Sequence, residues 1–331
     1  SARATGTMRH LVTGGAGFVG SHRVEALLAR GDEVEVLDDL SGGADGIGAA
    51  AVHPRLRRTC ASVLDASTVR SIVDRVDRVW HLAAVVGVPR VLADPRRAVR
   101  VNLEGTEVVV DACAAAGVPL VFTSSSEVYG DRAGELLRED DPVSPGATTS
   151  MRGSYGASKA LAEWALAAVR RESGLPVLVV RLFNTVGPRQ RAGHGMVLPR
   201  FVEQARKGRP LTVYGDGAQR RCFADVRDVA SHLVRLADRE DAFGRTFNVG
   251  SRVETPILGL AQLVRDLAGT GSEIAHVPWR EAFPGEERDV RRRVPDLGRL
   301  AAAVGSVPAT PLEETVAAML ASGVPVTAEA P

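Results

Sequence analysis

Tyr155 and Lys159 stand four positions apart in the stretch SYGASK, inside a segment that predicts a long helix. That spacing puts both side chains on one face of the helix. A free tyrosine has a pKa of about 10 and is a poor base at neutral pH, but an ammonium one helical turn away favours its phenolate. We therefore expect Tyr155 to take a proton from a substrate hydroxyl. The alternative is a surface tyrosine–lysine pair, which has the same spacing.

A second cluster of reactive side chains is the stretch SSSEVYGD, which follows the apolar run Val118–Phe122. A buried strand needs no such cluster at its end, whereas a reaction centre does. We expect Ser125 to hydrogen-bond the hydroxyl that Tyr155 deprotonates. Two interpretations of Glu127 stand. It handles a proton, directly or through Ser126 or a water, or its carboxylate hydrogen-bonds the backbone and orders the loop.

The stretch GGAGFVG carries Gly14, Gly17 and Gly20 between an expected strand and an expected helix. The first glycine allows a tight turn, the second lets the backbone approach a pyrophosphate, and the third lets helix and strand pack closely. The helix N-terminus then faces the anion. Asp38 follows at the distance of the acid that binds the ribose hydroxyls of NAD. An acid there repels the 2′-phosphate of NADP, so the motif predicts NAD.

The stretch HLAA at 81–84 ends a later strand with small residues. Carboxyl ends of parallel strands line the ligand crevice in such sheets. Leu82, Ala83 and Ala84 would let a flat cofactor lie against the backbone. Ordinary tight packing explains the same residues equally well.

These motifs fall on strands that alternate with helices. Strands are expected at 10–13, 33–37, 78–82, 119–123 and 176–182, and helices at 21–30, 69–76, 99–116 and 155–173. The alternation predicts a doubly wound parallel sheet with helices on both faces, an α/β Rossmann fold. After Phe183 the loops lengthen and short segments such as 211–214 and 246–249 appear, which predicts a smaller C-terminal α/β substrate-binding region.

The same alternation of strands and helices predicts a domain organisation. We expect an NAD-binding Rossmann domain at 8–182, with a returning segment near 223–250. The substrate-binding region is expected at 183–222 and 251–320. The ends, 1–7 and 321–331, are expected to be flexible.

Composition excludes several classes of protein. The net charge of +1 and the aromatic content of 4% argue against nucleic acid as a partner. No apolar run reaches the roughly 18 residues that span a bilayer, and the start has no apolar core of a signal peptide. Cys60, Cys113 and Cys222 are odd in number and widely spaced, which indicates a reducing cytoplasm rather than disulfides. The scattered histidines predict no metal site.

Taken in order, GGAGFVG, HLAA, SSSEVYGD, YGASK and RLFNTVGPR resemble the extended short-chain dehydrogenase/reductases that act on nucleotide sugars. The resemblance runs from about Met8 to Leu320. It implies a Rossmann domain holding NAD, a C-terminal region holding a nucleotide diphosphate sugar, and a triad of Ser125, Tyr155 and Lys159. One departure is the stretch ASVLD, where Ser62 stands in place of the family's acid near the adenine.

Further site residues follow from the resemblance alone. For the cofactor it implies Phe18, Val19 and Asn102, besides the glycines, Asp38, the HLAA residues, Tyr155 and Lys159. For the nucleotide sugar, a UDP-sugar first, it implies contacts from Asn184, Arg189, Leu198, Tyr214 and Arg221, with Arg221 approaching the diphosphate.

The family's reactions begin by oxidising C4 of the sugar and then diverge. UDP-glucuronic acid decarboxylases carry a hydroxyl–Ser–Glu sequence before VYG, similar to Ser125–Glu127. They also place an arginine ahead of a PD[IL] motif, which Arg293 matches and which is thought to meet the sugar carboxylate. A solvated charge face is the alternative interpretation of the run 291–293. We expect decarboxylation of UDP-glucuronic acid to UDP-xylose, with the hydride returned internally.

Two other kinds of function stay open. SYGASKALAE is typical of many 4-epimerases, and GDP-mannose dehydratases also carry a Ser–Glu pair. The dTDP-glucose 4,6-dehydratases usually have Asp-Glu at the position where Ser126 and Glu127 stand. A non-catalytic NAD(H) sensor would show a broken triad, whereas this triad is intact.

The helices expected at 99–116 and 155–171 are apolar on more than one face. One face must cover the sheet. A second face, including Val109, Ala112, Leu161 and Ala165, is expected to pair with another subunit. Because the family forms a four-helix dimer interface from two such helices per chain, we expect a homodimer; a bulkier core is the alternative.

Overall fold

The structure is a computed structural model of the 331-residue chain. It describes residues 6–43, 46–132, 136–144, 146, 148, 153–283, 290–305 and 309–322. Most of the two ends expected to be flexible, 1–7 and 321–331, therefore lies outside the described residues. No helix in the described part of the chain is long and apolar enough to cross a membrane.

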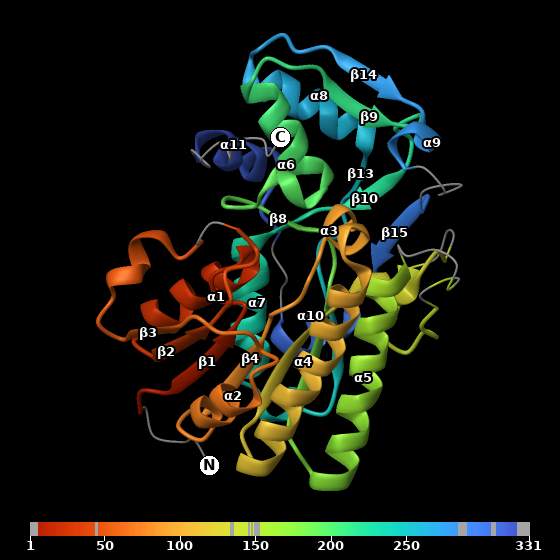
Figure 1. The fold of residues 1–331 in the computed structure, drawn as a ribbon. Helices are drawn as coiled ribbons and strands as arrows, with labels where there is room; N and C mark the ends of the chain where they lie inside the picture. Colours follow the sequence, from red (N-terminus) through yellow and green to blue (C-terminus); the bar gives the residue numbers. More distant parts are fainter. Residues whose placement is uncertain are drawn as a thin grey trace.

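A seven-stranded sheet forms the centre of the larger lobe (Figure 1), and all of its neighbouring strands run parallel. The strand order is β12-β7-β5-β4-β1-β2-β3. Their bounds are β1 Arg9–Thr13, β2 Glu33–Leu37, β3 Leu56–Thr59, β4 Arg78–His81, β5 Leu120–Ser125, β7 Val177–Leu182 and β12 Thr246–Val249. The order reverses direction between β1 and β4, so this sheet is the predicted doubly wound Rossmann fold.

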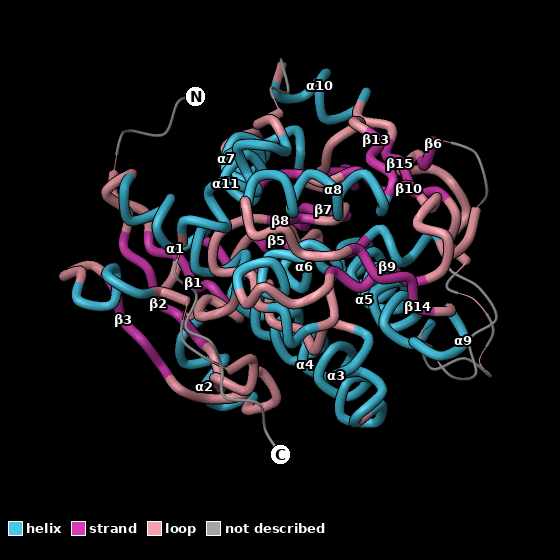
Figure 2. Tube along the Cα trace, turned by 90° about the horizontal axis from the view of Figure 1, so that it is seen from above, coloured by secondary structure: helices cyan, strands magenta, loops and turns pink. Residues whose placement is uncertain are grey.

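Alternation along the strands builds a core on each face of the sheet. In β1, Leu11 belongs to one buried cluster and Val12 to the other, because successive side chains of a strand point to opposite faces. Helices cover both clusters, as Figure 2 shows. One face carries α1 (Phe18–Ala29), α7 (Val226–Ala237) and α10 (Gly298–Val304), and the other carries α2 (Ala66–Val73), α4 (Pro95–Ala116) and α5 (Ser154–Ser173).

The smaller lobe packs around a third core. A four-stranded sheet has the order β13 (Glu254–Pro256), β10 (Arg220–Cys222), β15 (Arg292–Pro295), β6 (Leu136–Leu137). Two-stranded sheets pair β14 (Ile274–Val277) with β9 (Leu211–Tyr214), and β11 (Ala224–Asp225) with β8 (Thr185–Val186). The helices α6 (Val197–Arg206), α8 (Ile257–Ala268) and α11 (Leu312–Ala321) supply its apolar side chains.

Short elements complete the chain. They are α3 (Val88–Ala93), α9 (Trp279–Ala282) and the 3-10 turns η1 (Gly48–Val52), η2 (Ser126–Tyr129), η4 (Ala192–His194) and η5 (Glu240–Ala242). Among these, η2 continues directly from the carboxyl end of β5. It therefore carries the Ser126–Glu127 pair onto the edge of the sheet.

The expected elements of the first half are present, with shifted ends. Helix α4 begins at Pro95 rather than at 99, because Asp94 caps it by accepting the Arg97 N–H and proline suits the first turn. Strand β3 was not predicted, since its four residues LRRT carry too little apolar pattern. The helices after residue 183 were also missed, although α7 has a clear apolar face.

The proposed domain bounds remain a prediction, and two elements cross them. Strand β6, inside 8–182, pairs with β15 of the smaller lobe. Helix α10, inside 251–320, packs its Leu300 and Val304 into the Rossmann core. The two lobes therefore exchange elements across the proposed bounds.

Candidate active site

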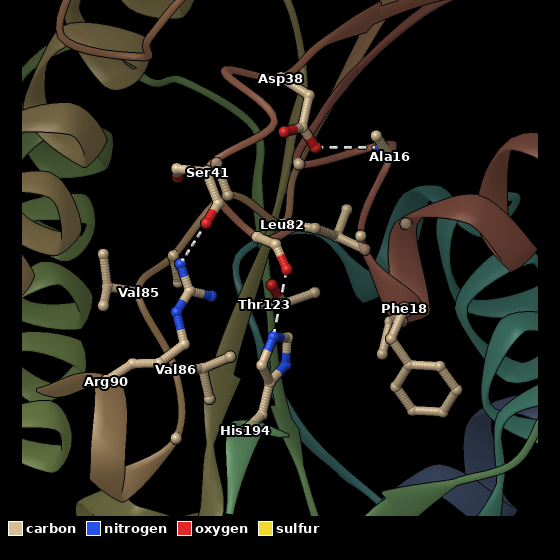
Figure 3. A pocket seen from close by; sticks show the side chains of 18 of the residues that line it. Ala16, Phe18, Asp38, Ser41, Leu82, Val85, Val86, Arg90, Thr123 and His194 are labelled. Carbon is tan, nitrogen blue, oxygen red and sulfur yellow. Dashed lines mark hydrogen bonds between the residues drawn. The ribbon is translucent and has the colours of Figure 1, made fainter. Parts of the chain in front are cut away.

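A cavity of about 430 Å³ lies at the carboxyl ends of the central strands. Its walls come from the loop after β1, the ends of β2 and β4, the turn after β5 and the start of α5. This is the crevice where the strand order reverses, the place where open α/β sheets bind ligands. Figure 3 shows the cavity from close by.

The glycine loop fits a dinucleotide. Gly14 has φ +68°, and a Cβ on it would lie 2.7 Å from the Ala83 backbone nitrogen. A Cβ on Gly20 would collide with the Gly14 carbonyl oxygen, so helix α1 packs against its own loop only through a glycine. No side chain caps α1 at Gly17, which leaves the first N–H groups of the helix for an anion. These backbone features would hold the pyrophosphate of NAD.

Asp38 stands where the ribose hydroxyls are expected. One oxygen of its carboxylate accepts the Ala16 N–H at 3.0 Å (Figure 3), and the other accepts the Leu40 N–H at 2.8 Å. A carboxylate oxygen can accept more than one hydrogen bond, so these contacts are compatible with a ribose hydroxyl as a further donor. The fixed negative charge in the cavity wall disfavours a 2′-phosphate, in agreement with NAD.

The adenine end departs from the family pattern as expected. Ala61, Ser62 and Val63 line the cavity, whereas Asp65 does not. Asp65 instead caps α2, accepting the N–H groups of Ser67 and Thr68. Its carboxylate also accepts the hydroxyls of Thr68 and Ser67, and these hydroxyls are the main reason that its pKa is held down at about 2. Its role in the structure is that of a helix cap.

The three triad side chains meet at one wall of the cavity. Ser125 ends β5, and its side chain hydrogen-bonds Tyr155 on the first turn of α5. Lys159 follows one turn later and donates to the Thr123 carbonyl at 2.8 Å. Helix α5 comes this close because Gly156 faces η2: a Cβ there would lie 2.6 Å from the Glu127 carbonyl oxygen. Ser125, Tyr155 and Lys159 all line the cavity.

The pKa shifts of Tyr155 and Lys159 correct one expectation from the sequence. Burial raises the pKa of Tyr155, and the Glu127 carboxylate raises it further, against a smaller opposing effect of the Ser125 hydrogen bond. Burial also lowers the pKa of Lys159 to about 7, and its ammonium lies 4.6 Å over the Phe122 ring. In the protein without ligands Lys159 therefore does not hold Tyr155 as a phenolate, because desolvation outweighs the attraction.

Glu127 and Arg293 are brought together from 166 positions apart. The Arg293 guanidinium donates to the Glu127 carboxylate, and also to the Gly130 carbonyl at 3.3 Å. The arginine side chain is 5% exposed, whereas that of Glu127 is 42% exposed and lines the cavity. Arg293 Nε is buried without a hydrogen-bond partner among the described residues. For Arg293 the solvated-face interpretation is therefore wrong, although Arg291 and Arg292 in the same run do lie nearer the surface.

Several other expected contacts can now be located. Phe18, Val19, Leu82, Ala83 and Ala84 line the cavity. Asn102 is buried and does not line it; its carboxamide holds the backbone N–H and carbonyl of Val85, at 2.7 and 3.1 Å. Asn102 thus shapes a lining loop from behind.

The expected nucleotide-sugar contacts divide into two groups. Asn184 and Arg189 line the cavity, and Arg189 forms an ion pair with Glu25 on α1, with contacts of 2.8 and 2.7 Å. Leu198, Tyr214 and Arg221 belong to the smaller lobe and are not among the lining residues. Their contact with a ligand remains a prediction.

Sequence reasoning missed the segments that close the cavity. Arg90 donates to the Ser41 carbonyl at 2.8 Å, and His194 contacts the Gly42 carbonyl at 3.2 Å (Figure 3). These contacts join the loop after β2 to α3 and η4 over the cavity. The glycine- and arginine-rich stretch 187–196 was recognised as a loop, but nothing in its pattern specifies which carbonyls it contacts.

Among the residues that the structure describes, no group of three or more His, Cys, Asp or Glu side chains is placed to hold a metal. Cys60, Cys113 and Cys222 are all free thiols.

The fold is a Rossmann fold whose crevice is lined by Ser125, Tyr155 and Lys159, and comparisons with known proteins show the family to which the chain belongs. The model described as "NAD dependent epimerase/dehydratase family" matches residues 10–250. A UDP-N-acetyl-alpha-D-glucosaminuronate decarboxylase of Bacillus cytotoxicus is 36% identical over 88% of this chain and 90% of that protein. UDP-glucuronic acid decarboxylase 1 of Xenopus tropicalis is 33% identical over 92% of this chain and 70% of that protein.

Solved structures give the same result. UDP-glucose 4-epimerase of Thermus thermophilus in complex with NAD matches with a TM-score of 0.81 at 32% identity, covering 95% of this chain and 98% of that one. The chain belongs to the NAD dependent epimerase/dehydratase family, and it is an NAD-dependent enzyme. The family predicted from the sequence motifs is confirmed.

Proposed function

We propose that this enzyme decarboxylates a UDP-linked hexuronic acid, UDP-glucuronic acid first, to give UDP-xylose through a 4-keto sugar. The observation that carries the proposal is the pair of Glu127 and Arg293 beside the triad. The Arg293 guanidinium is buried against the Glu127 carboxylate, and a guanidinium in such a place is suited to a second carboxylate, which is the group that decarboxylation removes. The relatives named as decarboxylases support the same reaction.

The triad residues perform the first step. Tyr155 takes the proton of the C4 hydroxyl, and Ser125 hydrogen-bonds both groups and orients them. Bound NAD, held by the glycine loop and Asp38, would supply the acceptor for the C4 hydride. Because burial opposes ionisation of Tyr155, the ammonium of Lys159 and the positive charge of the bound cofactor must together lower its pKa.

The second step uses Glu127 and Arg293. A 4-ketone makes the C6 carboxylate part of a β-keto acid, which loses CO2 readily. Arg293 would hold that carboxylate, and this displaces Glu127 from its ion pair. The freed Glu127 carboxylate would take up a proton from solvent and, directly or through Ser126 or a water, pass it to C5, which replaces the bond to the departing CO2.

The alternative function is a 4-epimerase, and one observation favours it. The fold superposes on a UDP-glucose 4-epimerase over nearly the whole chain, and epimerisation needs little beyond the triad. A 4,6-dehydratase would need an acid where Ser126 stands, which makes it less well supported. A non-catalytic NAD(H) sensor is disfavoured because the triad is assembled at the cavity.

One assay separates these functions. The purified protein is incubated with UDP-glucuronate, UDP-N-acetylglucosaminuronate, UDP-glucose and dTDP-glucose. The masses of the products are then measured by mass spectrometry. Loss of CO2 from either uronate supports the proposal. Loss of water from dTDP-glucose supports the dehydratase, and altered retention at unchanged mass supports the epimerase. Turnover of a neutral sugar with both uronates untouched would refute the decarboxylase.

We also propose that the enzyme is a homodimer joined through α4 and α5. Leu161 and Trp164 on α5 are large apolar side chains with exposed fractions of 46% and 60%. A groove beside them is lined by Leu103, Thr106, Glu107, Val110, Asp111, Ala162, Ala165, Ala168 and Val169. Two residues of the expected face must be corrected: Val109 and Ala112 are buried in the core of their own chain, so they are not available to a partner.

For the site of action we propose the cytoplasm. Three free thiols fit a reducing compartment, which supports this assignment. Fractionation of the source cells with an antibody against the protein tests it, and recovery in an extracellular fraction would overturn it.

A further inference from the structure

Glu163 is a buried carboxylate that the proposed mechanism does not use. It lies on α5 one turn after Lys159, and its side chain is 12% exposed. Its Oε1 accepts the Ser124 hydroxyl at 2.5 Å, and its two oxygens accept the Arg181 guanidinium at 3.0 and 2.6 Å. Helix α5, β5 and β7 are therefore joined directly behind the triad.

The contacts continue from Arg181 toward the smaller lobe. Arg181 Nη1 donates to the Tyr129 hydroxyl at 2.8 Å and to the Glu139 carbonyl at 3.0 Å. The Tyr129 hydroxyl donates to Asn248 Oδ1 at 2.7 Å. Asn248 Nδ2 donates to the Leu137 carbonyl on β6, the strand that pairs with β15. One buried network thus reaches from the catalytic helix to the strand that carries Arg293.

We propose that Glu163 is a positioning residue. It keeps Lys159 charged, and it holds the carboxyl end of β5, whose last residue is Ser125. The inference rests on the proposed chemistry of the triad at C4. A network that served only packing would need no ionic side chains, because apolar residues of similar volume stabilise a core as well or better.

Among the titratable groups that the structure describes around Lys159, Glu163 is the one that favours its charged form. From β4, His81 faces the ammonium but stays neutral, because burial lowers its pKa to about 3. From η2, Glu127 acts on Tyr155 and is engaged by Arg293. On α5 itself Glu163 is the group that raises the pKa of Lys159 against the effect of burial. Arg181, on β7, donates to the Glu163 carboxylate and so neutralises part of its charge.

The test is the pH profile of kcat for Glu163→Gln, with Glu172→Gln as the matched control. Glu172 is an exposed glutamate on the same helix. Glutamine still accepts from Ser124, so the amide keeps much of the network while the charge is lost. Lys159 should then lose its proton at lower pH. We expect the alkaline limb of kcat to move down by on the order of 1 pH unit, with KM changed less than kcat.

A limb that stays in place in folded Glu163→Gln protein, or that moves equally in Glu172→Gln, would overturn the proposal. Should Glu163→Gln fail to fold, the double variant with Arg181→Met removes both charges and restores a neutral core. It must show the same shift. The profile is recorded on whichever nucleotide sugar the wild type converts, because C4 oxidation is common to all three reactions. Failure of the wild type to release CO2 would then count against the decarboxylase alone.

Discussion

At the scale of single residues, the buried ammonium of Lys159 is the clearest conflict between stability and function. It is 1% exposed, and its charge is met by a carbonyl, an aromatic face and a carboxylate one turn away. Burial of a charge costs free energy unless it is fully compensated. The proposed mechanism gives this buried charge a purpose, because ionisation of Tyr155 during turnover would need a neighbouring cation.

This conflict predicts a gain in stability from Lys159→Met, with loss of activity. The pKa of Lys159 is lower in the folded protein, about 7, than in the unfolded chain. The cost of burying its charge is therefore complete below pH 7 and fades as pH rises toward the unfolded pKa. We expect the variant to have a higher Tm, by about 2–4 °C at pH 6, and a smaller gain at pH 9. Scanning calorimetry at both pH values checks this; a gain that grows with pH would contradict the sign.

Glu127→Gln tests the proton-handling role at the same scale. The amide keeps the size of the side chain but cannot carry a proton to C5. We expect kcat to fall by about 100-fold or more, while the affinity for NAD stays unchanged. Glu104→Gln, an exposed glutamate on α4, is the control. If turnover is untouched, Glu127 only orders its loop, the other interpretation of the sequence.

Elements, rather than side chains, set the distance between Tyr155 and Glu127. Helix α5 approaches η2 through Gly156, where a Cβ would lie 2.6 Å from a backbone oxygen. The contact joins the backbone of α5 to the backbone of η2, and neither can move aside as a flexible side chain would. The approach of the two elements therefore depends on this one glycine.

Gly156→Ala should consequently push α5 away from η2. Alanine is the better helix former, so the change tests contact rather than propensity. We expect kcat to fall about 10-fold or more, since small displacements of catalytic groups are costly. Gly259→Ala on α8 is the matched control, because a Cβ there meets only Pro256 at an ordinary 3.7 Å. Equal activity of both alanine variants would show that the contact at Gly156 is not required.

What the sequence could predict also depends on scale. The glycine loop, Asp38, Ser125, Tyr155 and Lys159 were predicted to share a site because their residue types and spacing have a local meaning, and all of them line the cavity. Their roles in binding and catalysis stay predictions. The environment of Tyr155 was not predicted, because its burial and the Glu127 charge come from segments that only the fold brings together. The contacts of Arg90 and His194 were missed for the same reason, because their partners are backbone groups distant in the chain. Strand β3 was missed because its residues LRRT carry little apolar pattern.

At the scale of the whole molecule, the two lobes and the proposed partner subunit share α5. Its inner face carries Tyr155 and Lys159, and its outer face exposes Leu161 and Trp164. An apolar pair of this kind on adjacent turns of one helix is suited to an interface core. A dimer formed here would brace the helix that holds Tyr155.

Trp164→Glu should therefore produce a monomer. A carboxylate buried in the interface would be costly to desolvate. Leu267→Glu on α8 is the control, because Leu267 is a comparably exposed apolar residue, at 44%, on the other lobe. Light scattering after size-exclusion chromatography measures both masses. A wild type that is itself monomeric, or a Trp164→Glu variant that remains a dimer, would reject this interface.

The central claim is that a ketone at C4 lets Arg293 and Glu127 manage the loss of the sugar carboxylate. The most direct measurement uses UDP-glucuronate carrying an isotopic label at C6, with NAD present and the NADH absorbance followed in parallel. The account predicts labelled CO2 in step with substrate consumption, and no net accumulation of NADH, because the hydride returns to the sugar. Conversion of the substrate with the label kept in the sugar product would contradict it.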